Sequence, residues 1–376
     1  MNKFKLNDQF LEIDLGAGQL SQFHYVWLRD NCPCSQCKHA DTRERILVTS
    51  EIPDDLKALD AKLAGDEIVI RWNDSDHESR FGLDWLNKHN YSNARFEADP
   101  AAGTPIIWDR ALQGTIPTFD YSEIHNDRTV LLSWCEAVRD YGLTIIQNAP
   151  LEEGEIERLA DYVGVIREVI YDRLHNVRAT PGEYNAYNVA STTLELKPHT
   201  DMPNYNNPPG VQMFHFLLNE SVGGESTAVD GLNIAAKLKA QDPGAYQVLA
   251  TTPVSFRMFS DRGDVIASNP LLTLDTFGEL KVFRFSNQLA QPSTLSPDKM
   301  EAFYAAYRKL GRLIEDPENR VQFRLRTGDI MVTNNLRVMH GRNAYDPSTG
   351  GRHLQLSYMD FDDVMSRIRM LKKEAA

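Results

Sequence analysis

Short apolar runs separated by turn residues fill the second half of the chain, and they restrict its possible folds more than any other sequence feature. Each run has the length of a β-strand and lacks the apolar spacing of an amphipathic helix. The runs are Val211–Leu218, Pro253–Phe259, Lys281–Phe285, Ile330–Thr333 and Gln355–Asp360. No glycine-rich phosphate-binding motif is present, so a doubly wound nucleotide-binding fold is disfavoured. The pattern predicts a mainly β barrel or jelly roll.

Helical patterns flank these strands. The segment Ser122–Tyr141 carries apolar residues on one face, and Gly142 follows it as a helix stop. Residues 142–146 then predict a buried strand, and Glu153–Val163 and Asp298–Leu313 predict two further helices. The predicted fold class is therefore mainly β, a jelly-roll domain with flanking helices.

The first part of the chain predicts a separate, small β-rich unit. Its strand-like segments are Leu11–Leu15, Phe23–Leu28, Arg45–Thr49 and Glu67–Trp72. Residues 100–120 are rich in proline and glycine without a clear period, which indicates a linker or a wrapped connection. We therefore expect an N-terminal domain at residues 1–95 and a larger domain at residues 115–376.

The charge of the chain argues against several classes of partner. Its 376 residues include 40 Lys and Arg and 53 Asp and Glu, which gives a net charge of −13. Such a chain is poorly suited to binding nucleic acid through its phosphates. No apolar run is long enough to cross a membrane, and acidic residues interrupt the N-terminus where a signal peptide needs an apolar core. We expect neither a nucleic-acid nor a membrane partner.

Three of the four cysteines lie close together, as Cys32, Cys34 and Cys37. This spacing does not suit a disulfide framework, and it fits a reducing cytoplasm. Thiolates at this density favour a structural zinc ion, which needs a fourth ligand. His39 is nearest in sequence and His77 is the other candidate, and local spacing does not choose between them. The alternative is a set of reduced cysteines without a metal.

A second candidate metal site combines His199 and Asp201 with a distant histidine. In an extended segment the side chains at positions i and i+2 point the same way, so His199 and Asp201 can reach one ion. The distant ligand is best sought at His340, which lies beyond a predicted strand. Two imidazoles and one carboxylate form the facial triad of non-haem Fe(II) oxygenases, which leaves about three adjacent coordination positions free. His215 lies in an apolar strand and is interpreted as a core residue.

An arginine that follows this triad fits an organic co-substrate. 2-Oxoglutarate chelates Fe(II) through its ketone and the adjacent carboxylate, and its far carboxylate needs a planar, two-pronged donor. Arg352 lies twelve residues after His340, and a strand beside the one that leads to His340 would bring it to the site. Arg342 is the competing candidate for this role.

Several long segments carry a resemblance to a known family. The first two are WLRDNCPCSQC and WNDSDH, near the start of the chain. The next is HTDMPNYNNPPGVQMFHFLLNESVGGESTAVDG, and the last is NNLRVMHGRNAYDPSTGGRHLQLSYMDFDDVMSRIR. On these segments the chain resembles the γ-butyrobetaine hydroxylase and trimethyllysine hydroxylase branch of the Fe(II)/2-oxoglutarate oxygenases, within the broader group typified by taurine dioxygenase. The resemblance covers nearly the whole chain.

The resemblance implies a fold and a set of site residues. The fold is a zinc module, with His77 as the fourth ligand, followed by a double-stranded β-helix, which is a jelly roll. The implied iron ligands are His199, Asp201 and His340. Arg352 would bind 2-oxoglutarate, Ser226 would lie near this co-substrate, and Asn188 would lie near both substrate and co-substrate. We also expect a homodimer.

At the substrate end the match to the family is incomplete. γ-Butyrobetaine hydroxylases hold a trimethylammonium group in an aromatic cage, which cation–π interactions stabilise. Tyr171 and Tyr358 match cage positions, whereas His175 stands in place of a tryptophan. Arg284 lies roughly where these enzymes carry an asparagine, and its charge suits a phosphonate. The implied substrate is therefore γ-butyrobetaine-like or a trimethylaminoalkylphosphonate.

Taken together, these features predict hydroxylation of a small molecule that bears an ammonium group and an anionic group. The reaction would use Fe(II), 2-oxoglutarate and O2, and it would release succinate and CO2. One alternative is a non-catalytic zinc-binding interaction module. The other is a metal-dependent hydrolase on a jelly roll, in which Arg352 has no evident role. Dependence of turnover on 2-oxoglutarate separates the three.

Overall fold

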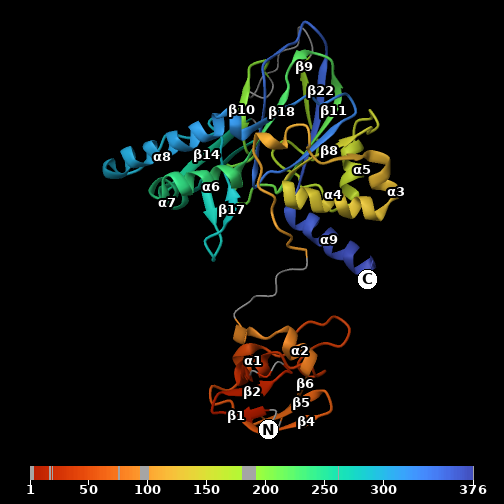
Figure 1. Cartoon of the computed structure of the whole chain (residues 1–376), viewed down its shortest axis with the longest axis vertical. Coiled ribbons are helices and arrows are strands. Elements are labelled where there is room, and N and C mark those ends of the chain that lie inside the picture. Colours follow the sequence, from red (N-terminus) through yellow and green to blue (C-terminus); the bar gives the residue numbers. More distant parts are fainter. Residues whose placement is uncertain are drawn as a thin grey trace. The chain divides into compact units, whose positions relative to one another are not determined.

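The computed structural model of the protein describes residues 4–16, 18, 20–74, 77–93, 101–179, 192–260 and 262–375. The chain forms two compact units, Met1–Asp99 and Pro100–Ala376 (Figure 1). In the described residues no helix is both long and apolar enough to span a membrane.

The first unit is built from two small antiparallel sheets. One sheet contains β1 (Phe4–Leu6), β2 (Phe10–Asp14) and β3 (Leu20–His24), and the other contains β4 (Ala58–Ala64), β5 (Glu67–Trp72) and β6 (Glu78–Gly82). The short helices are α1 (Tyr25–Asp30) and α2 (Leu83–Lys88). Alternate residues of β2 and β3 point inward, so that Leu11, Ile13 and Phe23 share a core with Ile68 and Trp72.

Two strand predictions in this unit were wrong. The predicted strand Phe23–Leu28 ends at His24, and the rest of it belongs to α1. The segment Arg45–Thr49 forms no strand, although Arg45 makes one isolated bridge to Lys38. Ile46 and Val48 are about half exposed, so this segment has no buried face on which a sheet could pack.

The second unit contains two facing sheets, as a jelly roll requires. The six-stranded sheet has the order β7 (Thr118–Asp120), β8 (Leu143–Gln147), β19 (Ile330–Asn334), β11 (Val211–Asn219), β22 (Arg352–Met359) and β9 (His175–Ala179). The four-stranded sheet has the order β10 (Leu196–His199), β20 (Val338–Arg342), β13 (Ser226–Asp230) and β18 (Arg320–Phe323). Phe214, Phe216 and Leu356 from the first sheet pack with Ala228 and Val338 from the second to form the core between them.

Helices cover the outer faces of both sheets (Figure 1). Those that pack on the six-stranded sheet are α3 (Tyr121–Asn126), α4 (Arg128–Tyr141), α5 (Glu155–Asp161) and α9 (Phe361–Ala375). Those that pack on the other side are α6 (Gly231–Gln241), α7 (Pro243–Thr251) and α8 (Pro297–Glu315). Between α7 and α8 the chain forms the hairpins β14 (Pro253–Ser260) with β15 (Gly263–Pro270) and β16 (Leu272–Leu274) with β17 (Leu280–Phe283). A further short pair is β12 (Val222–Gly223) with β21 (Tyr345–Asp346).

The helices differ from the sequence prediction in two respects. The predicted helix Ser122–Tyr141 is divided into α3 and α4, because the Asp127 side chain accepts a hydrogen bond from the Thr129 N–H and starts a new helix. In addition, α6, α7 and α9 were not predicted. Asp230 and Asp242 cap α6 and α7 in the same way, and Pro243 follows directly at the start of α7. These caps are the sequence signal that could have found both helices.

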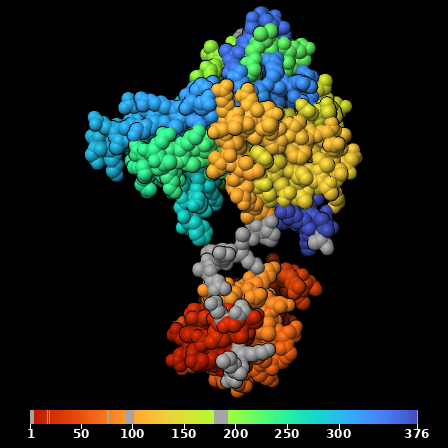
Figure 2. All heavy atoms as spheres, in the orientation of Figure 1, coloured from red at the N-terminus to blue at the C-terminus, as the bar shows by residue number. Residues whose placement is uncertain are grey.

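The proline- and glycine-rich segment before β7 packs on the second unit. Ala101, Trp108 and Leu112 are buried there, and Figure 2 shows this orange segment lying across the surface of the unit. The Trp108 indole donates a hydrogen bond of 2.7 Å to the Tyr141 carbonyl. The segment is therefore a wrapped connection over these residues, one of the two forms that its composition suggested.

Candidate active site and metal centres

The register of the four-stranded sheet brings the predicted triad together. His199 is the last residue of β10 and lies directly opposite His340 of β20. Asp201 follows two residues later, with its Oδ1 atom 3.2 Å from His199 Nε2 and 3.8 Å from His340 Nε2. One donor atom from each residue lies within 4.8 Å of the others. This spacing and donor set fit a divalent ion held on one face.

Each imidazole of the triad turns its Nε2 atom toward Asp201 Oδ1. His199 Nδ1 lies 2.9 Å from the Lys197 carbonyl, which can only accept, so Nδ1 donates to this carbonyl and Nε2 is the nitrogen left to bind a metal. The His340 ring packs against Phe214, with 4.8 Å between ring centroids. Burial, followed by the neighbouring His199, lowers the pKa of His340 to about 3. A neutral imidazole is the form that binds a metal.

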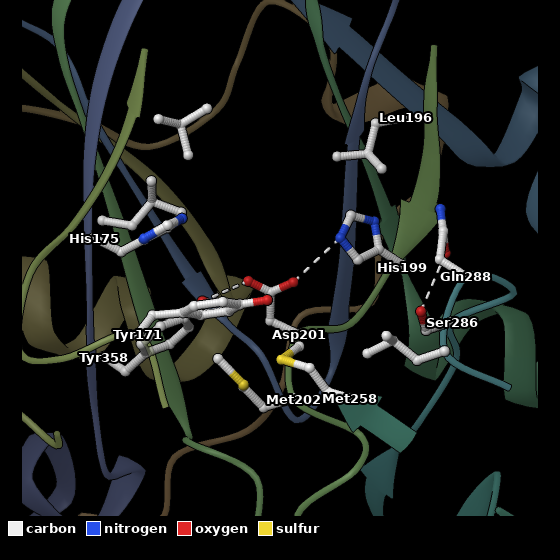
Figure 3. Close-up of a pocket in the computed structure, with 13 residues that line it drawn as sticks. Tyr171, His175, Leu196, His199, Asp201, Met202, Met258, Ser286, Gln288 and Tyr358 are labelled. Carbon is white, nitrogen blue, oxygen red and sulfur yellow. Dashed lines mark hydrogen bonds and ion pairs between the residues drawn. The ribbon is translucent and has the colours of Figure 1, made fainter. Parts of the chain in front are cut away.

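Asp201 is held at both its backbone and its side chain. Its N–H donates to Asn335 Oδ1 over 2.7 Å, and Asn335 Nδ2 donates back to the Asp201 carbonyl over 2.9 Å. Tyr358 donates its hydroxyl to Asp201 Oδ2 over 2.7 Å (Figure 3), and Gln212 Nε2 donates to the same oxygen. Burial alone would raise the pKa of Asp201, but hydrogen bonds from His199 and Tyr358 outweigh burial and hold this pKa well below its usual range. The carboxylate is therefore charged.

A pocket beside the triad, which we call the arginine pocket, contains two predicted arginines. Ser226, Arg342 and Arg352 line it together with the three triad residues. Arg352 is 6% exposed, and burial lowers its pKa to about 9. Within the described residues its guanidinium makes no ion pair, and its Nε has no hydrogen-bond partner. A buried, unpaired guanidinium is costly, so this pocket is suited to an anion.

Arg342 differs from Arg352 because backbone groups already occupy its guanidinium. Its NH1 donates to the Leu194 carbonyl over 2.7 Å, and its NH2 donates to the Thr192 carbonyl. Arg342 is thus bound to the segment that precedes β10. Ser226 is buried and lies opposite Arg342 in the pairing of β13 with β20.

His199 and Asp201 also line a second pocket, which we call the tyrosine pocket (Figure 3). Its lining includes Tyr171, His175, Met202, Met258 and Tyr358 along with His199 and Asp201. The Tyr171 and His175 rings are stacked, with 4.6 Å between centroids and 23° between planes. Burial is the main cause of a lowered pKa at His175. A neutral imidazole and two phenol rings therefore face a mainly apolar space.

The other predicted substrate residues are Arg284 and Asn188. Arg284 does not line the tyrosine pocket; it is buried, and it donates to Thr273 Oγ1 over 2.6 Å and to the Asn206 carbonyl over 2.9 Å. Burial lowers the pKa of Arg284 to about 10. Asn188 falls outside the described residues.

The structure also brings the cysteines of the first unit together with one histidine. His77 Nε2 lies 3.3, 3.7 and 3.6 Å from the Sγ atoms of Cys32, Cys34 and Cys37. His39 is not part of this cluster; its Nδ1 accepts from two nearby backbone N–H groups instead. Three thiols and one imidazole within 4.8 Å of one another match the donor set of a closed tetrahedral zinc site.

Residues that the sequence reasoning missed support both sites. Arg29 is buried and donates to Cys37 Sγ over 3.2 Å while it pairs with Asp74 over 2.8 Å. Gln212 and Asn335 hold Asp201, as described above. A polar residue inside the apolar run Val211–Leu218 was the available signal for Gln212, whereas nothing local distinguishes Asn335 from its neighbour Asn334.

Two family models match the chain. Residues 70–358 match the family model described as taurine catabolism dioxygenase TauD, TfdA family, and residues 3–87 match the model described as gamma-butyrobetaine hydroxylase-like, N-terminal. The chain is 37% identical to a gamma-butyrobetaine dioxygenase of Pseudomonas sp. (strain AK-1), across 95% of this chain and 92% of that protein. It is 31% identical to the gamma-butyrobetaine dioxygenase of Homo sapiens (94% and 92% covered) and 30% identical to the mitochondrial trimethyllysine dioxygenase of Mus musculus (94% and 84% covered).

Proposed function

The chain belongs to the TauD/TfdA family of Fe(II)- and 2-oxoglutarate-dependent dioxygenases, and from that premise we propose that it hydroxylates a small molecule with an ammonium group at one end and an anionic group at the other. The observation that carries this proposal is that His199 and Asp201 line two chemically different pockets. The arginine pocket is suited to an anion, and the tyrosine pocket is suited to an organic cation.

Different residues would bind the metal, the co-substrate and the substrate in this reaction. When bound, Fe(II) and 2-oxoglutarate activate O2 and transfer one oxygen atom to a C–H bond, with release of succinate and CO2. His199, Asp201 and His340 would hold the iron on one face, and the buried Arg352 would bind the far carboxylate of 2-oxoglutarate. The apolar lining of the tyrosine pocket would exclude water and aim one C–H bond of the substrate at the metal.

The ammonium end of the substrate is proposed to lie against Tyr171 and Tyr358. Phenol rings attract a quaternary ammonium through their faces, and the interaction strengthens when water is excluded. His175 would complete this wall as a neutral imidazole, because burial lowers its pKa. The related enzymes whose names state a substrate act on γ-butyrobetaine or trimethyllysine, which both carry such a group.

The anionic group of the substrate is proposed to be either a carboxylate or a phosphonate. Arg284 is the predicted partner for it, and within the described residues no carboxylate pairs with this buried guanidinium. Its hydrogen bonds to Thr273 and to the Asn206 carbonyl support a structural role as well. Asn188 stays a predicted substrate contact, and Ser226 and Arg342 stay predicted contacts of the co-substrate.

The test is formation of succinate from 2-oxoglutarate with matched trimethylamino carboxylates and trimethylamino phosphonates. A phosphonate preference is expected, and Arg284→Asn should weaken turnover of the phosphonate by about 10-fold while the carboxylate changes less, because a charged hydrogen bond is lost. Arg257→Asn is the matched control, since Arg257 is an exposed residue that pairs with Asp264. If the wild-type protein prefers γ-butyrobetaine and Arg284→Asn keeps this preference, the phosphonate proposal is wrong and the substrate is a carboxylate.

We also propose that the first unit is a structural zinc domain, with Cys32, Cys34, Cys37 and His77 as ligands, and that the protein is a cytoplasmic homodimer. The four donors and the small core of this unit support a metal that contributes to its stability. The domain boundaries 1–95 and 115–376 stay a prediction from the sequence, and the two compact units, Met1–Asp99 and Pro100–Ala376, support a division into two domains.

Elemental analysis is expected to find about one zinc per chain, separate from iron. His77→Ala should lose this zinc and destabilise the first unit, whereas the matched variant His39→Ala should keep it, because His39 lies outside the cysteine cluster. Metal content and thermal unfolding of both variants measure this. Loss of zinc from His39→Ala alone would show that the other histidine is the ligand.

A further inference from the structure

The two oxygens of the Asp201 carboxylate lie in different surroundings. Oδ1 faces the metal-binding nitrogens of His199 and His340, at 3.2 and 3.8 Å. Oδ2 faces away from them and accepts hydrogen bonds from the Tyr358 hydroxyl, at 2.7 Å, and from Gln212 Nε2. The two lone pairs of Oδ2 are therefore in use, while those of Oδ1 are directed at the metal site.

Strand pairing places the two donors side by side. Gln212 of β11 lies directly opposite Tyr358 of β22, so both side chains emerge on the same face of the six-stranded sheet. Gln212 is fully buried, and its Oε1 has no hydrogen-bond partner in the described part of the chain. A carboxylate only accepts hydrogen bonds, so the amide must turn its NH2 group toward Asp201. Gln212 Nε2 also lies 3.5 Å from the Tyr358 hydroxyl oxygen, so the contacts of this buried NH2 group are with the carboxylate and with the tyrosine that holds the same carboxylate.

We propose that Gln212 and Tyr358 form a clamp that restricts Asp201 to binding the metal through Oδ1 alone. An octahedral ion offers six positions, and three one-atom ligands leave about three of them open. Chelation by 2-oxoglutarate takes two of these positions, and the last must stay open for O2. A carboxylate that bound through both oxygens would take that position. The proposal rests on the metal site of the proposed function and gives Gln212 and Tyr358 the role of positioning residues.

The clamp also connects the substrate to the metal ligand. Tyr358 lines the tyrosine pocket with one part of its ring and holds Asp201 with its hydroxyl (Figure 3). A ligand that packs against the Tyr358 ring therefore contacts the same residue whose hydroxyl orients Asp201. The ring and the hydroxyl have separable effects: the ring would contact a cation, whereas the hydroxyl would set the coordination of the metal.

The experiment removes each donor and leaves the surrounding shape nearly unchanged, with Tyr358→Phe and Gln212→Leu. The full-length apoprotein is loaded with Mn(II), and two quantities are measured: the affinity for Mn(II) and the water-proton relaxivity for each bound ion. Relaxivity counts the water molecules on the metal, so a second carboxylate oxygen should lower it by about one third, from three open positions to two. The affinity for Mn(II) should fall by about 10- to 100-fold, as for other residues that support metal ligands.

Tyr171→Phe is the matched control, because it removes a hydroxyl from the other tyrosine of the same pocket. Its relaxivity should equal that of the wild type, even if substrate binding weakens. Relaxivity at the wild-type value in both Tyr358→Phe and Gln212→Leu would overturn the clamp, whatever happens to the affinity. The relaxivity measurement needs no turnover. An absence of 2-oxoglutarate-dependent activity in the wild type would therefore contradict the proposed function, while the relaxivity values would still test the clamp.

Discussion

Replacing Asp201 with alanine is expected to abolish 2-oxoglutarate-dependent turnover and leave a folded protein. Asp201 supplies the negative charge of the triad, and its carboxylate is held charged by its neighbours. Without it, two neutral imidazoles would bind Fe(II) weakly and in no fixed orientation. A fall in kcat/KM by about three orders of magnitude or more is expected, which corresponds to ~4 kcal/mol at the transition state. His199→Ala and His340→Ala should give losses of the same order.

The cost of Asp201→Ala to stability should be moderate. Asn335 holds the backbone of residue 201, and this contact does not depend on the side chain. However, Tyr358 and Gln212 would lose their acceptor, at a cost of about 1–3 kcal/mol for buried groups left unpaired. Thermal unfolding, iron content and succinate formation would measure these effects together. Asp161→Ala, at an exposed position of α5, is the control. Normal turnover by Asp201→Ala would mean that the metal is held elsewhere.

Arg352→Ala is expected to raise the KM for 2-oxoglutarate by about 100-fold or more. Removing one partner of a buried, hydrogen-bonded charge pair costs about 2–5 kcal/mol, because the other charge is left unpaired. Arg352→Lys should lie between the wild type and the alanine variant, since lysine keeps the charge and lacks the planar fork. The measurement is the dependence of succinate formation on 2-oxoglutarate at a saturating substrate concentration.

A second readout separates this role from a structural one. The guanidinium of Arg352 is buried without an ion pair among the described residues and packs over the Phe216 and Tyr345 rings. Its removal in the absence of 2-oxoglutarate should therefore cost only these packing contacts, because no paired charge is lost. The wild type should gain thermal stability when 2-oxoglutarate and Mn(II) are added together, and Arg352→Ala should lose the part that depends on 2-oxoglutarate. An unchanged KM in Arg352→Ala would transfer the role to Arg342.

Much of the fold follows from patterns that are local in sequence. The strands β11, β19 and β22 were predicted with small errors at their ends. They could be predicted because a strand that is buried in a jelly roll has a short run of apolar residues. The helix α8 was also predicted, because its apolar residues recur at helical spacing over a long segment. The errors fall where tertiary contacts override local preference. The residue types of Tyr25–Leu28 favour a strand. In the structure this segment is part of α1, and Tyr25 and Leu28 lie on one face of that helix and are buried in the core.

The cysteine and histidine patterns carried most of the information about the sites. The residues that orient these ligands were missed for a physical reason. Asn335 lies 134 residues from Asp201 in sequence and Gln212 lies 11 residues from it. A single buried amide leaves no periodic pattern at either distance. Asn334 and Asn335 are adjacent and chemically identical, and the fold alone gives Asn335 the contact with Asp201.

The sequence by itself determined which chemical groups are available and which short-range pairs can act together. Spacing of two residues in an extended segment brings His199 and Asp201 to one side, and the CxCxxC spacing brings three thiols together. Only the tertiary structure decided which distant groups complete these pairs. The register of β10 with β20 sets His340 opposite His199, and the cysteine cluster takes in His77 and leaves out the nearer His39. The sequence does not separate Arg342 from Arg352 as the arginine that binds 2-oxoglutarate. In the structure, backbone carbonyls accept hydrogen bonds from Arg342, whereas Arg352 is buried beside the triad without an ion pair among the described residues. Burial and pairing depend on neighbours that only the folded chain supplies.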